Sequence, residues 1–295
     1  MWVIFALLTS MISATYYVCN QKCKLNAHIF MVYRGFFVAL MALPLVLANF
    51  HVFPWQFYAI AVLQGLCVSY SDYRYFQVFH KFGAANVNAV TPLSVFVIFL
   101  LWLLLKPETI IMYMETPVRS AVICTSIALI IFSVIKYRNS KIGGSCLKEV
   151  FPLLFLSAMI NISNKIIMEY NDGHLLLLTF NRVVITGVII GIVNLLFARK
   201  YIPSFRELIK PENMRKGWFL FLMVMSMTTT NLAMHYAQNP AYVTSLFFTS
   251  VIWIRLYTKI VQMLGKNDSY EYVKIRWILL LLFACTTLLI ATQTK

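Results

Sequence analysis

The 295-residue chain has few charged residues, and acidic residues are especially scarce among them. Asp, Glu, Lys and Arg together make up 12% of the sequence, about half the share usual in soluble domains. Apolar side chains make up 61%, against roughly 45–50% in soluble proteins. A soluble protein of this length could not bury so much apolar surface. The composition therefore excludes an ordinary soluble domain and favours an integral membrane protein.

Sequence motifs of several enzyme and cofactor classes are also missing. The chain contains no H-E-x-x-H, no G-x-S-x-G elbow, no nucleotide-binding loop and no paired Asp motif for polyprenyl phosphates. Its six cysteines include no C-x-x-C pair and have no His or Cys partners at zinc-binding spacing. We therefore predict neither an enzyme nor a bound metal or cofactor, and no ATP-driven pumping within this chain.

The net charge of +15 comes from basic residues that lie mostly between apolar segments. In such positions Lys and Arg contact lipid headgroups and set membrane topology. No basic stripe is interleaved with aromatic residues on a polar face, as nucleic-acid binding would need. The expected partner is the lipid bilayer, and no nucleic-acid partner is expected.

Apolar stretches that could cross a bilayer recur along the whole chain, since one spanning helix needs roughly 20 residues. The first stretch lacks a basic n-region and a cleavage motif, so we interpret it as a span rather than a signal peptide. The fold class predicted is all-α integral membrane with ten transmembrane helices. Their predicted ranges are 2–20, 27–48, 55–80, 82–105, 117–136, 148–168, 174–197, 216–238, 240–264 and 274–293. Pro92 is expected to kink the fourth span.

The two halves of the chain resemble each other. A shift of about 148 residues places Arg34 on Arg182, each about one third into its span. The tight connection at 81–87 matches the one at 237–243 with a shift of about 156. Because five spans is an odd number, a second set of five enters the membrane from the opposite side. We therefore predict a 5+5 inverted repeat, an arrangement typical of secondary transporters.

The repeat gives a single membrane domain with two halves. Residues 1–140 form the first five-helix repeat and residues 146–295 the second. The segment between them includes Gly143-Gly144 within a basic stretch.

With this plan the chain resembles the drug/metabolite transporter superfamily, in its ten-helix EamA-like branch. The resemblance rests on the 5+5 plan, the tight hairpins and the run Gly83-Ala84-Ala85-Asn86-Val87-Asn88-Ala89-Val90-Thr91-Pro92, with Glu108 beyond it. Tyr236-Ala237-Gln238-Asn239-Pro240-Ala241 is similar to the matching segment of the second half, although Phe247-Phe248 replaces the proline of the family pattern. The resemblance implies alternating-access transport of a small metabolite.

Ionisable groups inside membrane spans are costly, so each is a candidate for function. Asp72 and Arg74 are two residues apart and do not face each other on a helix. Asp72 therefore needs another partner, which could be Arg34, Arg255, the substrate or a transported proton. Lys165 and Glu169 are one helical turn apart and can pair with each other. The candidate substrate-binding residues are Arg255, Asp72, Arg34, Arg182, Tyr75, Asn88, Asn164, His235 and Tyr236.

Basic groups outnumber acidic ones within the spans, and Arg binds carboxylates and phosphates with two hydrogen bonds. The function predicted is secondary active transport of a small polar metabolite, either amino-acid-like or another solute with a carboxylate or phosphate. A coupling proton or an exchanged solute is a possible further partner. The alternatives are a membrane-embedded enzyme and a non-transporting scaffold.

The expected location is multi-pass in a bacterial inner (plasma) membrane, as a monomer or homodimer. The orientation stays open. Alternate loops, above all residues 199–216, contain most of the Lys and Arg, and the positive-inside rule then places both termini outside the cytoplasm. The family resemblance implies cytoplasmic termini.

Overall fold

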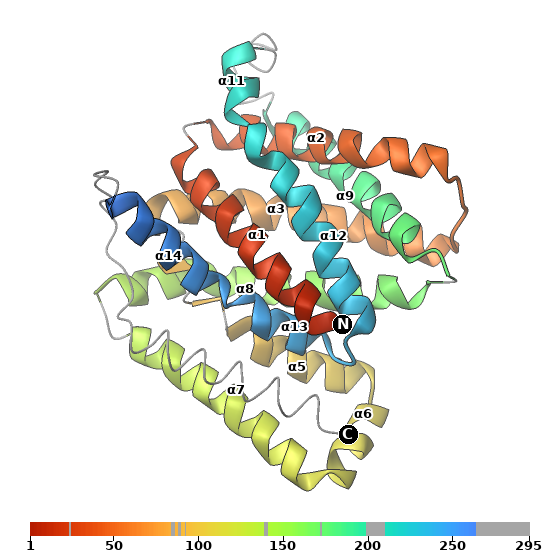
Figure 1. The fold of residues 1–295 in the computed structure, drawn as a ribbon, viewed down its shortest axis with the longest axis vertical. Coiled ribbons are helices and arrows are strands. Elements are labelled where there is room, and N and C mark those ends of the chain that lie inside the picture. Colours follow the sequence, from red (N-terminus) through yellow and green to blue (C-terminus); the bar gives the residue numbers. More distant parts are fainter. Residues whose placement is uncertain are drawn as a thin grey trace.

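The computed structural model describes residues 1–23, 25–83, 86–87, 90–91, 93–138, 141–171, 173–198 and 210–263. Throughout these ranges the regular structure is helical and contains no strand (Figure 1). The prediction of an all-α protein is confirmed.

Four helices in the first half coincide closely with predicted spans. They are α1 (Trp2–Lys22), α2 (Ala27–Ala48), α3 (Trp55–Phe82) and α7 (Pro117–Arg138). α5 (Leu93–Leu105) covers the second part of the predicted span 82–105, and the short α6 (Glu108–Glu115) lies before α7. α3 ends at Gly83, whose positive φ of 82° suits a residue without a side chain. α5 begins directly after Pro92, which itself lies outside the described residues, so the expected kink there is not observable.

The second half follows a similar plan. It contains α8 (Lys141–Glu169), α9 (Leu175–Ala198), the short α11 (Pro211–Lys216), a 3-10 turn (Trp218–Leu220), α12 (Phe221–Tyr236), α13 (Pro240–Phe247) and α14 (Ser250–Met263). Asn239 caps α13 by accepting a hydrogen bond from the Ala241 N–H, and Pro240 occupies the first turn. The predicted span 240–264 is not one continuous helix, because it is interrupted between α13 and α14. The predicted span 274–293 lies outside the described residues.

Four helices of the described chain are long and apolar enough to cross a membrane. They are Trp2–Asn20, Ala27–Ala48, Gly144–Glu169 and Leu175–Phe197. A fifth candidate is the bent pair of α5 and α6, whose axes differ by 109°. α3 is long enough but contains polar residues such as Gln64 and Asp72, which lower its mean hydropathy. These helices are compatible with a multi-pass membrane protein.

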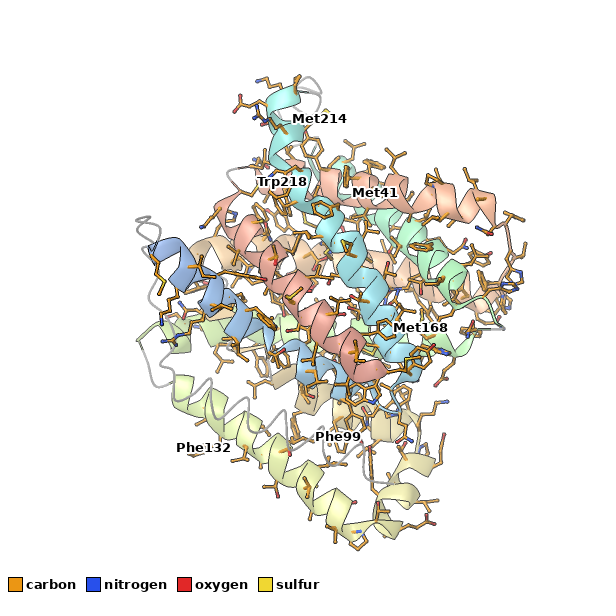
Figure 2. All side chains as sticks on the ribbon, viewed as in Figure 1. Met41, Phe99, Phe132, Met168, Met214 and Trp218 are labelled. Carbon is orange, nitrogen blue, oxygen red and sulfur yellow. The ribbon has the colours of Figure 1, made fainter. Side chains whose placement is uncertain are left out.

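Apolar side chains also cover much of the outer surface. In Figure 2, Met41 on α2 and Phe132 on α7 point away from the helix bundle, and they are 43% and 47% exposed. Phe99 and Met168 are buried among the helices. An apolar exterior of this kind suits contact with lipid rather than water.

α1 runs antiparallel to α12 across the centre of the view, in front of α3 and α8 (Figure 1). Near the start of α1, Phe5 stacks on Tyr236 with ring centroids 6.2 Å apart. Near its end, Tyr16 contacts Phe219 at 5.7 Å. α3 packs on α8 and α9, α5 on α8 and α13, and α1 also on α13 and α14.

The most extensive helix pair is α2 with α9, and small residues form its crossing point. Gly35 and Ala39 of α2 face Gly187 and Gly191 of α9. A methyl group on Gly35 would lie 2.3 Å from the Gly191 nitrogen and 2.7 Å from the Gly187 oxygen. Each helix thus contributes a small-xxx-small pattern, which lets the two backbones approach closely.

We expect Gly35→Ala to destabilise the protein by about 2 kcal/mol or more, because the added methyl group meets backbone atoms that cannot rotate away. Thermal unfolding of the purified protein in detergent measures this effect. Leu40→Ala, on the same helix at a position that is 66% exposed, is the matched control. An unchanged melting temperature for Gly35→Ala would contradict the close crossing.

Candidate functional site

A cavity of about 230 Å³ lies between helices of both halves of the chain. Residues of α1, α2, α3 and α5 line it together with residues of α8, α9, α12 and α13. Its charged lining residues are Arg34, Asp72 and Arg182. Its remaining polar residues are small hydroxyl and amide side chains, together with tyrosines.

Five of the predicted substrate-binding residues line this cavity: Arg34, Asp72, Tyr75, Asn164 and Arg182. They come from four helices that are distant in sequence, namely α2, α3, α8 and α9. Asn88 lies outside the described residues. These five residues were predicted because they place ionisable, amide or tyrosine side chains within membrane spans. The structure brings them together at one cavity.

Arg255, His235 and Tyr236 do not belong to the lining of this cavity. Arg255 is partly buried on α14, beyond the interruption that separates this helix from α13. His235 and Tyr236 end α12, and Tyr236 is 45% exposed. The sequence analysis treated residues 240–264 as one helix and did not foresee the interruption.

Asp72 forms an ion pair with Arg34, from Arg34 Nη1 to Asp72 Oδ2. Arg34 is buried on α2, and 26% of the Asp72 side chain is exposed. Of the partners predicted for Asp72 from the sequence, Arg34 is thus the one that the structure shows. The pair compensates a buried guanidinium, which would otherwise be strongly destabilising.

Arg182, which the predicted repeat matches to Arg34, is held differently. It is only 3% exposed, and it donates through Nε to Gln64 Oε1 at 2.6 Å and through Nη1 to Asn231 Oδ1. Both partners are neutral amides. Within the described part of the chain no carboxylate pairs with Arg182. The cavity lining therefore has one positive charge that its own residues leave uncompensated.

Arg182 also fixes the orientation of the amides around it, because a guanidinium has donors and no acceptor. Gln64 must turn its oxygen to Arg182, so its Nε2 faces α8. There Nε2 donates to Asn164 Oδ1 at 2.6 Å and to the Ile160 carbonyl at 3.1 Å. Since Asn164 accepts through its oxygen, its amide nitrogen is left for another partner.

The group as a whole presents hydrogen-bond donors. Bonds to described residues use two of the five guanidinium N–H donors of Arg182, so three have no partner in the described ranges. Asn164 lines the cavity with an amide nitrogen that has no partner among the described residues. Asn231 Nδ2 is buried without a hydrogen-bond partner. A cation surrounded by unused donors is suited to bind an anion.

Gln64 is the residue that the sequence analysis missed. It orients Arg182 and Asn164 at the same time. A glutamine within the otherwise apolar stretch 57–68 was a signal for it, since buried amides in a membrane need partners.

Lys165 has a structural role next to this site. Its Nζ donates to the carbonyls of Met234 at 3.0 Å and His235 at 3.4 Å, at the end of α12. These carbonyls have no partners within the helix, so Lys165 caps it. Lys165 and Glu169, which could have paired with each other, have separate partners among the described residues, and Glu169 pairs with Lys106 at 3.3 Å.

No group of three or more His, Cys, Asp or Glu side chains in the described ranges could hold a metal ion. Comparison of the chain with protein-family models and with curated protein sequences finds no match.

Proposed function

We propose that this protein is a secondary active transporter that moves a small organic anion across a membrane by alternating access. The observation that supports this most directly is Arg182, a buried cation without an acidic partner in the described chain, at a cavity between the two halves. A buried charge of this kind is costly unless it is used. A bound anion would compensate it.

The 5+5 inverted repeat belongs to this proposal, and the helix packing supports it. Under the predicted repeat α1 corresponds to α8, α2 to α9, α3 to α12, and α5 to α13 with α14. The contact of α1 with α12 then corresponds to that of α8 with α3. The pairs α2–α9 and α5–α13 each join a helix to its own counterpart. Ala39 and Gly187, also 148 residues apart, meet at the α2–α9 crossing.

Transport by alternating access follows from such a plan, because two similar halves can rock against each other around a central site. Membership of the drug/metabolite transporter superfamily, in its EamA-like branch, remains part of the proposal and rests on the motif resemblance. A membrane-embedded enzyme and a non-transporting scaffold are the alternatives, and no specific feature of the cavity favours either.

The location and orientation are also proposed. Lys22, Lys81 and Lys210 lie at ends of α1, α3 and α11, on the face where Tyr17 contacts Phe79 and Tyr16 contacts Phe219. By the positive-inside rule this face is cytoplasmic, which places residue 1 on the other side. A bacterial plasma membrane and a monomeric or homodimeric state complete the proposal.

Counterflow in proteoliposomes tests the function. Carboxylates and phosphate monoesters are first screened for stabilisation of the purified protein against heat. A radiolabelled compound that stabilises it is then added outside vesicles loaded with the same unlabelled compound. We expect saturable uptake that depends on the internal compound. Binding without flux across the whole set would favour a scaffold, and chemical conversion of a compound would favour an enzyme.

A further inference from the structure

The cavity has two polar ends of opposite hydrogen-bonding character. At one end Arg182 and the amide nitrogen of Asn164 offer donors and a positive charge. Asp72 is the acidic residue of the described lining, and Arg34 already compensates it. At this end an anion therefore meets a cation and amide donors, whereas the acceptors there, such as Asn161 Oδ1, are neutral.

Asn20 of α1 also borders the cavity. Thr9 and Ser13 of α1 bond Thr229 and Ser226 of α12, so the two helices are antiparallel. Asn20 and Asn231, the partner of Arg182, therefore lie on opposite sides of the Ser13–Ser226 pair.

The side chain of Asn20 is buried, and its Oδ1 has no hydrogen-bond partner. A buried acceptor without a partner is unfavourable by itself and is satisfied by a ligand that donates to it. Asn20 is seven residues beyond Ser13, whose hydroxyl bonds Ser226 on α12 at 2.6 Å. This interval corresponds to about 10 Å along the helix.

Aromatic rings line the cavity between these ends. Tyr17 lies 5.0 Å from Phe79 and 6.3 Å from Phe247, and Phe79 stacks on Tyr75 at 5.9 Å. All four residues belong to the lining, and they come from α1, α3 and α13. Connected ring faces of this kind favour a flat apolar group, through offset or edge contacts.

From these three features we infer that the cavity selects a two-ended organic anion. The anionic group binds Arg182, a planar ring packs against the aromatic residues, and a hydroxyl or similar donor at the far end binds Asn20. This inference rests on the proposed function and names the substrate class of the same site.

The arrangement discriminates against α-amino acids. In these compounds the ammonium group is attached to the carbon next to the carboxylate, so it must lie beside Arg182 whenever the carboxylate binds there. Like charges at that distance repel each other, and the free amide nitrogens nearby are donors as well. Removing the ammonium group from an aromatic amino acid therefore improves binding.

Three compounds with the same ring test this inference. They are 3-(4-hydroxyphenyl)propanoate, free L-tyrosine, which adds the ammonium group, and 3-phenylpropanoate, which lacks the hydroxyl. Titration calorimetry on the purified full chain measures their affinities. We expect free tyrosine to bind at least about tenfold more weakly than the first compound, and phenylpropanoate several-fold more weakly.

The variant Asn20→Leu separates the contribution of the far end. In this variant the affinity ratio between the hydroxylated and unhydroxylated acids should fall to about one, because the acceptor is gone. The comparison of the three compounds on the unmodified protein does not depend on that variant folding.

Equal or tighter binding of free tyrosine overturns the inference, and so does a ratio that Asn20→Leu leaves unchanged. If other anions bind in an Arg182-dependent way while none of the three compounds does, the inference fails and the proposed function stands. If no anion binds or is transported at all, the proposed function fails.

Discussion

Replacing Arg182 with glutamine should lower anion affinity and transport by about 100-fold while the protein stays folded. The expected loss reflects charge-assisted hydrogen bonds to the ligand, which contribute roughly 1.5–3 kcal/mol each. Folding should survive because glutamine keeps an amide donor for Gln64 or Asn231 and removes a costly buried charge. Counterflow and thermal unfolding, measured on the same preparation, give the two quantities.

Two further variants sharpen this result. Arg182→Lys keeps the charge but loses the planar fork of donors, so it should recover only part of the affinity. Arg74→Gln removes an arginine of α3 that bonds Gln77 and lies outside the cavity lining, and it should leave transport unchanged. Full transport by Arg182→Gln would show that the cavity is not an anion site centred on Arg182.

Replacing Asp72 with asparagine should destabilise the protein by about 3 kcal/mol, near the lower end of the range for breaking a buried ion pair. The loss arises because Arg34 stays buried without its carboxylate, and it is moderated because 26% of the Asp72 side chain is exposed. Thermal unfolding in detergent measures it.

The double variant Arg34→Gln/Asp72→Asn is the control for this pair. It removes both charges, so no guanidinium is left uncompensated, and most of the lost stability should return. The lining would keep its single excess positive charge at Arg182, and anion binding should therefore change by no more than several-fold. If the double variant is as unstable as the single one, Arg34 is not the residue that Asp72 compensates.

The different partners of Arg34 and Arg182 also explain why these two arginines were hard to distinguish from sequence. Arg34 and Arg182 occupy matching positions under the predicted repeat, and both were predicted as candidate site residues. The two arginines differ in the partners that other helices supply. Asp72 pairs with Arg34, whereas Arg182 bonds Gln64 and Asn231. Neither set of partners follows from spacing along one helix.

Composition and hydrophobic periodicity, both properties of the sequence, were sufficient to predict an all-α chain with apolar helices long enough for a membrane. They also predicted the positions of α1, α2, α3, α7 and α9, because an apolar run of about 20 residues bounded by polar residues has few other stable conformations in lipid. The predicted start of a span at residue 240 coincides with the start of α13, where the fixed φ and missing N–H of Pro240 suit the first turn.

Contacts between segments that are distant in sequence could be identified only from the tertiary structure. The close α2–α9 crossing at Gly35 and Gly187, the interruption between α13 and α14, and the amide orientation around Arg182 all depend on which helices face each other. A hydrogen bond between residues more than 100 positions apart leaves no periodic signal in the chain. The sequence thus determined which charged groups lie in apolar helices, and only the folded bundle decided that Arg34 has a carboxylate partner and that Arg182 has amide partners.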